Sequence, residues 1–252
     1  MHYFYIDNRN LGLGMDIELD SGDINHAFRV LRLKKNDPVI ISDGRGKAFR
    51  AEVVFASAEK VTVLLKELTA SNESSLQLTL LQSLAKGEKM DQVIRQTVEL
   101  GVSRIIPVKS ERSIPLPDEK KGLKRLQRWQ SIARSAAAQS RRAFIPLVED
   151  LMGFDDAVNT IRGTTTIVPW ELEKCQSLPQ ILKQPCPDDK AVSLFIGPEG
   201  GFSSREIEVL QQSGAVTVHL GPRIMRTETA SVVTVALIEA FWGDYSGEVD
   251  RN

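Results

Sequence analysis

From residue 76 onward, the sequence alternates between short strand-like runs and longer segments with helical spacing of apolar residues. The strand-like runs occupy 76–82, 103–108, 164–169, 192–197 and 216–221. Helical spacing is found at 89–101, 118–140, 203–214 and 229–241. Such alternation predicts an α/β fold, in which helices cover a mostly parallel sheet.

The first seventy residues have a different pattern, because their apolar runs are short and separated by tight turns. Strands are expected at 39–42, 48–55 and 61–65, with a hairpin turn at Asp43, Gly44 and Gly46. The pattern predicts a small β-barrel. A polar stretch over 69–75 separates the two patterns and marks a domain boundary. We therefore expect one domain over 1–70 and a second over 74–247.

Basic residues are concentrated in the middle of the chain. The net charge is −1, but residues 71–150 carry 14 basic and 9 acidic side chains. On the expected helix 118–140, apolar residues from Leu123 to Ala137 keep helical spacing, and the opposite face carries Lys121, Lys124, Arg125 and Arg128. A local basic surface suits binding to a polyanion. A solvated helix face without a ligand explains the same count.

Cysteine and hydropathy patterns bear on the cellular setting. Cys175 and Cys186 are the only cysteines, and they form no CxxC motif. They indicate neither a disulfide framework nor a zinc site, and no histidine has a partner at metal-ligand spacing. The sequence shows no signal peptide and no apolar run of about 18 residues. We therefore expect a cytoplasmic protein without a membrane segment or a metal ion.

Two glycine-containing loops follow expected strands near the C-terminus. They are I-G-P-E-G-G-F at 196–202 and G-P-R-I-M-R-T-E-T-A at 221–230. Ligands of α/β sheets bind at the carboxyl ends of strands, where glycine lets the backbone approach them. Neither loop matches a phosphate-binding motif. Each loop alone is more often a tight turn, but together with Arg226 to Thr229 at a helix start they favour a ligand site.

These and further motifs resemble one family over nearly the whole chain. The chain is similar to the RsmE family of 16S ribosomal RNA uridine-N3 methyltransferases, in the SPOUT superfamily. The matching segments are H-A-F-R-V-L-R-L (26–33), S-D-G-R-G (42–46), K-G-E-K-M-D (86–91), E-L-G-V (99–102), S-E-R-S (110–113), A-Q-S-R-R (138–142), I-G-P-E-G-G (196–201) and L-G-P-R-I-M-R-T-E-T-A (220–230). Two departures are Met225, where the family usually has Leu, and the N-terminal H-Y-F-Y, where it commonly has an early basic residue.

The resemblance implies a fold, a cofactor and partners. The fold would be an N-terminal PUA-like β-barrel followed by a SPOUT α/β domain with a C-terminal trefoil knot. The protein would act as a homodimer on 16S rRNA in the small ribosomal subunit, and its cofactor would be S-adenosyl-L-methionine. Three loops would hold this cofactor, through Val168, Pro169, Trp170, Ile196, Gly197, Glu199, Gly200, Gly201, Leu220, Gly221, Ile224 and Met225.

Catalytic residues are expected from the chemistry of uracil N3, which must lose a proton before it attacks a methyl group. Arg226 is the candidate for stabilising the resulting charge on the uracil oxygens. The alternative for Arg226 is a structural role, as a salt bridge to Glu228 or as a backbone clamp. Glu199 and Glu228 are both candidates for the base.

RNA contacts carried over from the resemblance are His26, Arg29, Arg32, Lys86, Lys89, Arg112 and Arg142. Trp170 can touch the cofactor, whereas Trp129 and Trp242 are expected in the core or at an interface. Two other functions remain open at this point. One is a non-catalytic rRNA-binding assembly factor, and the other is methylation of another RNA position, such as a tRNA ribose hydroxyl.

Overall fold

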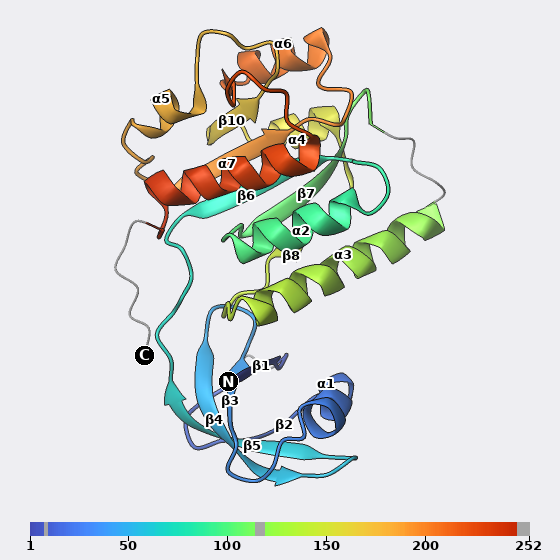
Figure 1. Cartoon of the computed structure of the whole chain (residues 1–252), viewed down its shortest axis with the longest axis vertical. Helices are drawn as coiled ribbons and strands as arrows, with labels where there is room; N and C mark the ends of the chain where they lie inside the picture. Colours follow the sequence, from blue (N-terminus) through green and yellow to red (C-terminus); the bar gives the residue numbers. More distant parts are fainter. Residues whose placement is uncertain (8–9, 114–118, 246–252) are drawn as a thin grey trace. The chain divides into compact units, whose positions relative to one another are not determined.

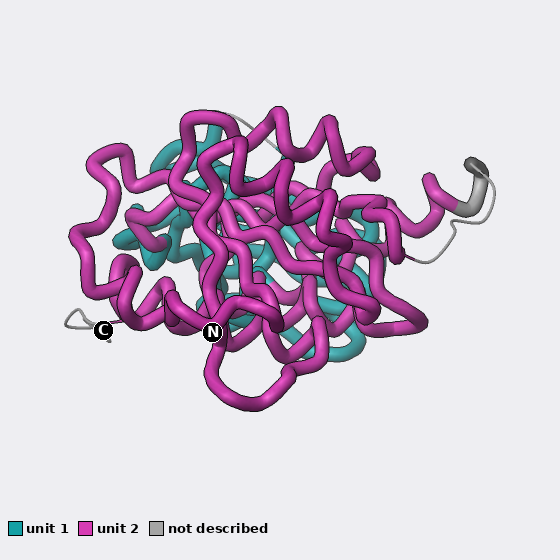
Figure 2. Tube along the Cα trace, turned by 90° about the horizontal axis from the view of Figure 1, so that it is seen from above, with its two compact units in different colours: residues 1–73, 137–145 teal, residues 74–136, 146–252 magenta. Residues whose placement is uncertain are grey.

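The computed structural model describes residues 1–7, 10–113 and 119–245, and the side chains of all of these except 119–121. The chain forms two compact units, shown in teal and magenta in Figure 2. Unit 1 consists of Met1–Glu73 and Ala137–Ile145. Unit 2 consists of Ser74–Ala136 and Pro146–Asn252. The chain first passes from unit 1 to unit 2 inside the polar stretch 69–75, and the later segment of unit 1 was not anticipated from the sequence.

Unit 1 contains a five-stranded sheet of order β1-β3-β4-β5-β2 (Figure 1). The three strands expected from the sequence are confirmed as β3 (Pro38–Ser42), β4 (Ala48–Ala56) and β5 (Val61–Leu68). They form an antiparallel meander. The expected turn follows β3, where the Asp43 carboxylate accepts the backbone N–H groups of Arg45 and Lys47 at 2.8 and 3.0 Å.

Four short elements complete unit 1 and were not predicted. They are β1 (His2–Tyr5), β2 (Asp16–Glu18), helix α1 (Ser21–Asn25) and the π-helix η1 (His26–Val30). β1 pairs in parallel with β3, whereas β2 pairs antiparallel with β5. The alternating apolar residues of the sheet and the buried faces of α1 and η1 enclose one hydrophobic core, which includes Ile24, Ala27, Val39 and Val63.

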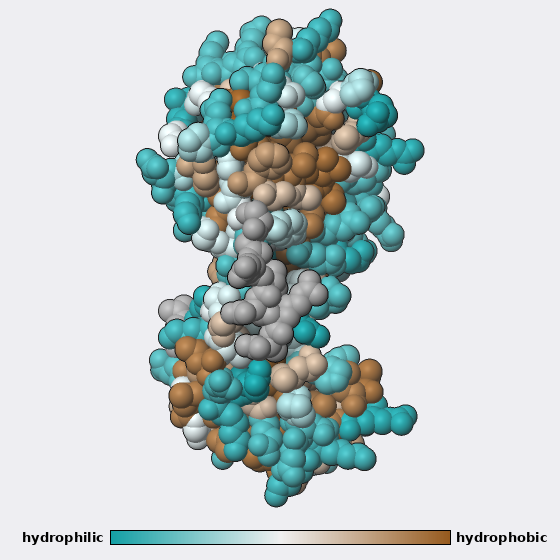
Figure 3. Space-filling model, turned by 60° about the vertical axis from the view of Figure 1, so that its left-hand side comes forward, coloured by the Kyte–Doolittle hydropathy of each residue, from teal (hydrophilic) through white to brown (hydrophobic). Residues whose placement is uncertain are grey.

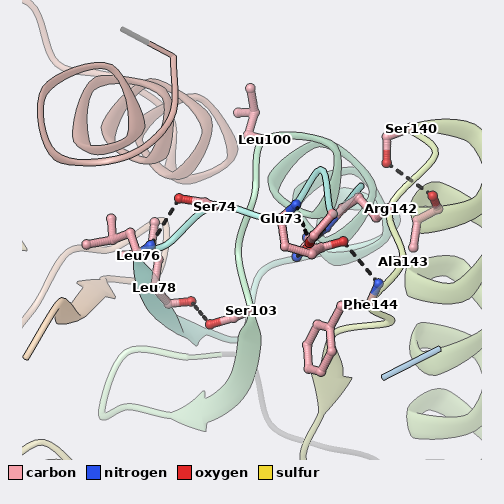
Figure 4. Close-up of polar contacts among 12 residues, drawn as sticks. Glu73, Ser74, Leu76, Leu78, Leu100, Ser103, Ser140, Arg142, Ala143 and Phe144 are labelled. Atoms are coloured by element: carbon pink, nitrogen blue, oxygen red, sulfur yellow. Dashed lines mark hydrogen bonds and ion pairs between the residues drawn. The ribbon is translucent and has the colours of Figure 1, made fainter. Parts of the chain in front are cut away.

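Residues 137–145 belong to unit 1 because hydrogen bonds hold them against its strands. The Tyr5 hydroxyl donates to the carbonyl of Arg142 at 2.8 Å, and the Ser42 hydroxyl donates to the carbonyl of Ala143 at 2.8 Å. Glu73 accepts from the Arg142 guanidinium at 2.7 Å and from the backbone N–H of Phe144 at 3.0 Å (Figure 4). No local sequence pattern predicts hydrogen bonds between segments so far apart in the chain.

Unit 2 contains a parallel sheet of order β12-β10-β11-β6-β7-β8, with β9 also paired to β7. The strands are β6 (Gln77–Ser83), β7 (Arg104–Lys109), β8 (Leu147–Val148), β9 (Met152–Gly153), β10 (Thr165–Pro169), β11 (Ala191–Ile196) and β12 (Val216–Val218). The parallel sheet was predicted from the sequence. Five of its strands were predicted as well, namely β6, β7, β10, β11 and β12. The two-residue strands β8 and β9 were not, because so short a run carries no periodicity.

Helices cover both faces of this sheet (Figure 1). They are α2 (Lys89–Glu99), α3 (Glu119–Gln139), α4 (Phe154–Thr160), α5 (Leu178–Leu182), α6 (Ser204–Gln212) and α7 (Thr227–Trp242). One face carries α2 and α7, which pack on each other. The other face carries α4 and α6, whose Phe154 and Ile207 share a core cluster with Phe195 of β11.

The four predicted helices are confirmed, with small differences at their ends. α7 begins at Thr227 rather than Thr229, and α6 begins after Ser203, whose hydroxyl accepts the N–H of Glu206 as an N-cap. β12 ends at Val218, so His219 lies in a loop and not on a strand. Leu123 was placed on the apolar face of α3, but its side chain is exposed. Residue 118, the expected start of α3, and residues 246–247 of the expected second domain lie outside the described residues.

Candidate active site at the ends of three parallel strands

Three loops meet at the carboxyl ends of β10, β11 and β12, which are neighbours in the sheet. They enclose a cavity of about 620 Å³. Its size falls within the usual range for ligand pockets, roughly 300–1,000 Å³. Eleven of the twelve predicted cofactor residues line it, namely Pro169, Trp170, Ile196, Gly197, Glu199, Gly200, Gly201, Leu220, Gly221, Ile224 and Met225. Val168 does not line it, because its side chain is fully buried in the core below the loop.

Glycines are required in the loop that follows β11. A Cβ on Gly197 would lie 3.1 Å from the Phe202 ring, and one on Gly200 would lie 3.3 Å from Cβ of Arg112. Gly201 has a φ of +67°, and a Cβ there would overlap the Glu171 carboxylate. The loop is closed by a hydrogen bond from the Gly201 N–H to the Pro198 carbonyl at 3.0 Å. The glycines thus keep the backbone, rather than side chains, at the cavity wall.

The loop after β12 presents backbone donors and apolar side chains to the same cavity. Gly221 has a φ of +107°, and its N–H donates to Nδ1 of His219 at 3.2 Å. Within the described residues, the N–H groups of Ile224 and Met225 find no hydrogen-bond acceptor. The Ile224 side chain is 87% exposed. Free amides beside apolar side chains suit a ligand with both polar and apolar parts.

A buried polar network fixes the start of α7 against the strands that carry the cavity. The Thr227 hydroxyl donates to the carbonyl of Gly197 at 2.7 Å and accepts from the side-chain amide of Gln82 at 3.1 Å. The Ser231 hydroxyl donates to the other end of the Gln82 amide at 2.6 Å. Gln82 was not among the predicted site residues, because β6 carries several polar residues and none of them stands out in the sequence. The network positions Arg226, which immediately precedes α7.

Lys89 lies between two carboxylates at the edge of the cavity. Its Nζ is 3.2 Å from Oε1 of Glu199 and 3.4 Å from Oε2 of Glu228. The hydrogen bond to Glu199 raises the pKa of the Lys89 ammonium above its usual value, against the opposing effect of burial. Burial works against ionisation of Glu199, but the backbone N–H of Lys86 and the Lys89 ammonium outweigh it and lower the pKa of that carboxyl. The two ion pairs therefore fix Lys89 in position as a cation, and Glu199 is a weak base.

Arg226 and Glu228, the candidates for charge stabilisation and for the base, have different placements. Arg226 lines the cavity, its side chain is exposed, and within the described residues its guanidinium has no ion-pair partner. The alternative salt bridge to Glu228 is not formed, since Glu228 pairs with Lys89. Glu228 is buried and is not among the residues that line the cavity. Of the two, Arg226 is placed to meet a ligand directly.

The residues predicted to contact RNA divide into three groups. In unit 2, Lys89 faces the cavity as described, the Lys86 side chain is exposed, and the Arg112 guanidinium donates to the carbonyl of Gly200 at 3.0 Å. In unit 1, the side chains on and after η1 are exposed, namely His26, Arg29 and Arg32. Arg142 differs, because its side chain is buried and its guanidinium is bound to Glu73. That placement gives Arg142 a structural role in unit 1.

The tryptophans are placed as follows. Trp170 lines the cavity, whereas Trp129 and Trp242 are buried. The Trp129 indole donates to Asp91, and the Trp242 indole donates to the carbonyl of Gln184. Among the described residues, no helix is long and apolar enough to cross a membrane. In that same part of the chain, no group of three His, Cys, Asp or Glu side chains could hold a metal ion.

Relatives with known names are similar to this chain over most of its length. Ribosomal RNA small subunit methyltransferase E of Bacillus subtilis is 32% identical over 221 residues, which cover 86% of this chain and 86% of the relative. The protein of the same name from Synechocystis is 34% identical over 226 residues, or 89% of this chain and 73% of the relative.

Solved structures give the same result. The crystal structure of ribosomal RNA small subunit methyltransferase E from Neisseria gonorrhoeae, bound to S-adenosyl methionine, has a TM-score of 0.88 and 33% identity. The match covers 97% of this chain and 99% of that one. A methyltransferase from Legionella pneumophila in complex with its cofactor SAM has a TM-score of 0.80 and 29% identity, covering 96% and 98% of the two chains.

Family models agree with these matches. Residues 72–239 match the RNA methyltransferase domain, and residues 19–66 match the RNA methyltransferase PUA domain. The N-terminal PUA domain and the α/β methyltransferase domain are thus both as expected. The chain belongs to the RsmE family of RNA methyltransferases, the family of ribosomal RNA small subunit methyltransferase E.

Proposed function

We propose that this protein transfers a methyl group from S-adenosyl-L-methionine to N3 of a uridine in 16S ribosomal RNA. The observation that carries the proposal is the cavity at the ends of β10, β11 and β12, with Arg226 and Lys89 at its wall. The names of the relatives from Bacillus subtilis and Neisseria gonorrhoeae support the reaction class and the methyl donor.

The cavity fits the cofactor by its own chemistry. Trp170, Leu220 and Met225 offer apolar surface for an adenine ring, and the unpaired N–H groups of Ile224 and Met225 can donate to its nitrogens. Gly197 and Gly221 leave room for close approach, since no Cβ projects from either residue. Glu171, whose side chain is exposed at the cavity, supplies negative charge for the ammonium and sulfonium groups. When bound, the cofactor supplies an electrophilic methyl group.

Arg226 and Lys89 have a shared task in this site. Deprotonated uracil spreads its negative charge over N3 and the two neighbouring oxygens. A guanidinium without an internal partner can donate to one of those oxygens in a fixed plane, and a nearby ammonium adds positive potential. Because Lys89 is held by Glu199 and Glu228, its position is set before RNA arrives. We assign the direct contact to Arg226 and the supporting charge to Lys89.

The carboxylates of Glu199 and Glu228 serve mainly to hold the Lys89 ammonium in place. The pKa of Glu199 is lowered, which makes proton uptake at neutral pH unfavourable. Glu228 stands behind Lys89 and does not line the cavity. The N3 proton then passes to solvent water, since the Arg226 side chain at the cavity is exposed. Stabilisation of the resulting uracil anion by positive charge, together with alignment of N3 with the methyl group, accounts for the chemistry without a strong base in the site.

We further infer a homodimer with a trefoil-knotted C-terminal region, acting on the small subunit in the cytoplasm. α7 supports the dimer, because it carries a second apolar stripe that its own unit leaves half-buried or exposed. The stripe consists of Val233, Ala236, Leu237, Ala240 and Phe241, at helical spacing. Figure 3 shows hydrophobic residues gathered on the surface of unit 2. The knot is supported by β10 lying between β12 and β11, with α7 packed on β11 and α5.

Mass-spectrometric mapping of 16S rRNA from cells with and without the protein tests the reaction. We expect one uridine to lose its N3 methyl group in the deletion strain and to regain it with the purified protein and S-adenosyl-L-methionine. Titration with S-adenosyl-L-methionine is the parallel measurement. If no saturable binding is found, the function that remains is that of an rRNA-binding assembly factor. If a ribose hydroxyl is methylated, the acceptor is that hydroxyl and not uracil N3.

A further inference from the structure

Unit 1 has a cavity of its own, with a volume of about 310 Å³. Its walls come from β1, from η1 and the residue that follows it, and from the C-terminal end of α3 with the residues after it. The side chains that matter here are His2, Tyr3, His26, Leu31, Gln139 and Arg141. All of them belong to unit 1, although Gln139 and Arg141 lie more than a hundred residues from the others in sequence.

Arg141 is fixed at this cavity by its neighbours. The carbonyl of Arg142 accepts from the Tyr5 hydroxyl, and the carbonyl of Ala143 accepts from the Ser42 hydroxyl and from the Gly46 N–H at 3.1 Å. The next side chain, Arg142, is bound by Glu73. The chain is therefore anchored directly after Arg141, while the Arg141 side chain itself is exposed at the cavity.

Uncommon backbone conformations gather around the same cavity. Arg141 has a φ of +61° and Arg32 a φ of +53°, in the left-handed region that residues other than glycine rarely adopt. η1 is a π-helix, a rare form that is frequently found at functional sites. Strain of this kind persists where the surrounding structure enforces it and a site benefits from the geometry. The cavity adds the concave surface that strained backbone alone does not provide.

The lining of the cavity suits a flat, polar and aromatic ligand. Tyr3, His2 and His26 offer rings for stacking, and the nitrogens of the two histidines offer hydrogen bonds. Burial raises the pKa of the Tyr3 phenol to about 12, so the phenol keeps its proton. The charges of two acidic residues, Glu73 and Asp43, act on the Tyr3 phenol. Both residues are engaged elsewhere, because Glu73 binds Arg142 and Asp43 accepts backbone N–H groups. Among the described residues, no carboxylate lines this cavity.

We propose that this cavity binds an unpaired nucleobase of the RNA substrate, at a nucleotide other than the one that is methylated. The base stacks on Tyr3 and His26, and Arg141 contacts its edge or the adjoining phosphate. Proteins read single-stranded RNA in this way, with aromatic side chains for the bases and arginine for the backbone. Exposed Arg29 and Arg32 lie on and just after η1, where they can extend the contact with phosphates. The proposal rests on the proposed function, because it takes RNA as the substrate.

Steady-state methylation of small ribosomal subunits, isolated from cells that lack the protein, tests the proposal. We expect Tyr3→Ala and Arg141→Ala to raise KM for the subunit about tenfold. The value of kcat and the affinity for S-adenosyl-L-methionine should not change. Tyr3→Phe keeps the ring and should stay close to wild type. The matched controls are Phe55→Ala and Arg50→Ala, which remove an exposed aromatic and an exposed arginine of β4 outside this cavity.

A second measurement locates the RNA directly. Small-subunit RNA that contains 4-thiouridine is irradiated with the protein, and cross-linked peptides are identified. We expect a cross-link on the peptide that carries Tyr3, and its loss in His26→Ala, an exposed position whose change should not affect folding. Wild-type KM in both Tyr3→Ala and Arg141→Ala, or cross-links only outside unit 1, would overturn the proposal while methylation itself continues. Absence of any methylation by the wild-type protein would instead refute the proposed function, and the nucleobase site with it.

Discussion

The two cavities of this protein are built in opposite ways. In unit 2, the walls follow three adjacent parallel strands, so that each loop arrives at the same edge of the sheet as a direct result of strand order. In unit 1, the cavity forms only because residues 137–145 return to strands at the start of the chain, as in the Tyr5 to Arg142 hydrogen bond. A site created by strand order can be found from motifs, whereas one created by remote docking needs the folded chain.

The largest effect is expected at the unit 2 cavity, from Arg226→Ala. Loss of the unpaired guanidinium should lower kcat by about 10²- to 10³-fold, because it removes charge stabilisation in the transition state. The affinity for S-adenosyl-L-methionine should be unchanged. Single-turnover methylation and calorimetric titration measure the two quantities. The control is Arg205→Ala on α6, whose exposed side chain lies 3.7 Å from Asp155. Equal turnover in Arg226→Ala and wild type would contradict the charge argument.

Glu73→Ala tests the docking that creates the unit 1 cavity. The substitution leaves the buried Arg142 guanidinium and the Phe144 N–H without this acceptor, and it should lower the free energy of unfolding by about 3 kcal/mol. Urea unfolding followed by circular dichroism measures the change. Glu52→Ala is the control, since Glu52 pairs with Lys66 at the surface and should cost at most about 0.5 kcal/mol. Similar losses in the two variants would show that Glu73 does not anchor the segment.

Gly101→Ala tests the packing between the end of α2 and Glu239 of α7 in unit 2. Gly101 follows α2 with a φ of +112°, and a Cβ would lie 2.9 Å from Oε1 of the buried Glu239. Conformational strain and crowding together should cost about 2–3 kcal/mol. Gly163 follows α4 with a φ of +80°, and a Cβ there would meet nothing within 4 Å. Gly163→Ala should therefore cost only about 1 kcal/mol. Thermal unfolding of both variants separates the crowding from the strain.

The smallest effect concerns the pH dependence of the Lys89 cluster. The pKa of Glu199 is lowered by folding, so its contribution to stability is present above the unfolded pKa and is lost as the pH falls through the folded value. The pKa of Lys89 is raised, so its contribution is lost as the pH rises through its folded value. The wild type should therefore have a higher Tm than Lys89→Met between about pH 6 and 9, and the difference should shrink below about pH 4 and above about pH 11.

Lys86→Met is the control for this pH profile. Lys86 contributes its backbone N–H to Glu199 at 2.9 Å, and its side chain is exposed. The variant should follow the wild-type profile throughout the pH range. A difference between Lys89→Met and wild type that does not vary with pH would mean that Lys89 acts through packing rather than through its charge.

Local patterns predicted most of the regular structure. The hairpin at Asp43, the strands β6 and β11 and the helix α2 follow from periodicity and turn chemistry within a few residues. The cavity loops of unit 2 were also found in this way. The placement of residues within the site could not be predicted in this way. Lys89 was predicted to contact RNA, but in the structure it pairs with two carboxylates. Glu228 looked like a cavity residue and is buried behind Lys89.

The sequence by itself determined the class of fold, the two glycine loops and the family, because these depend on residue order over short distances. The tertiary structure decided that residues 137–145 join unit 1, that Arg142 is a buried anchor and that Arg141 faces a cavity. The physical reason is that burial and ion pairing depend on which distant segments meet. A basic residue has the same letter in the sequence whether it is anchored by Glu73 or exposed to a ligand.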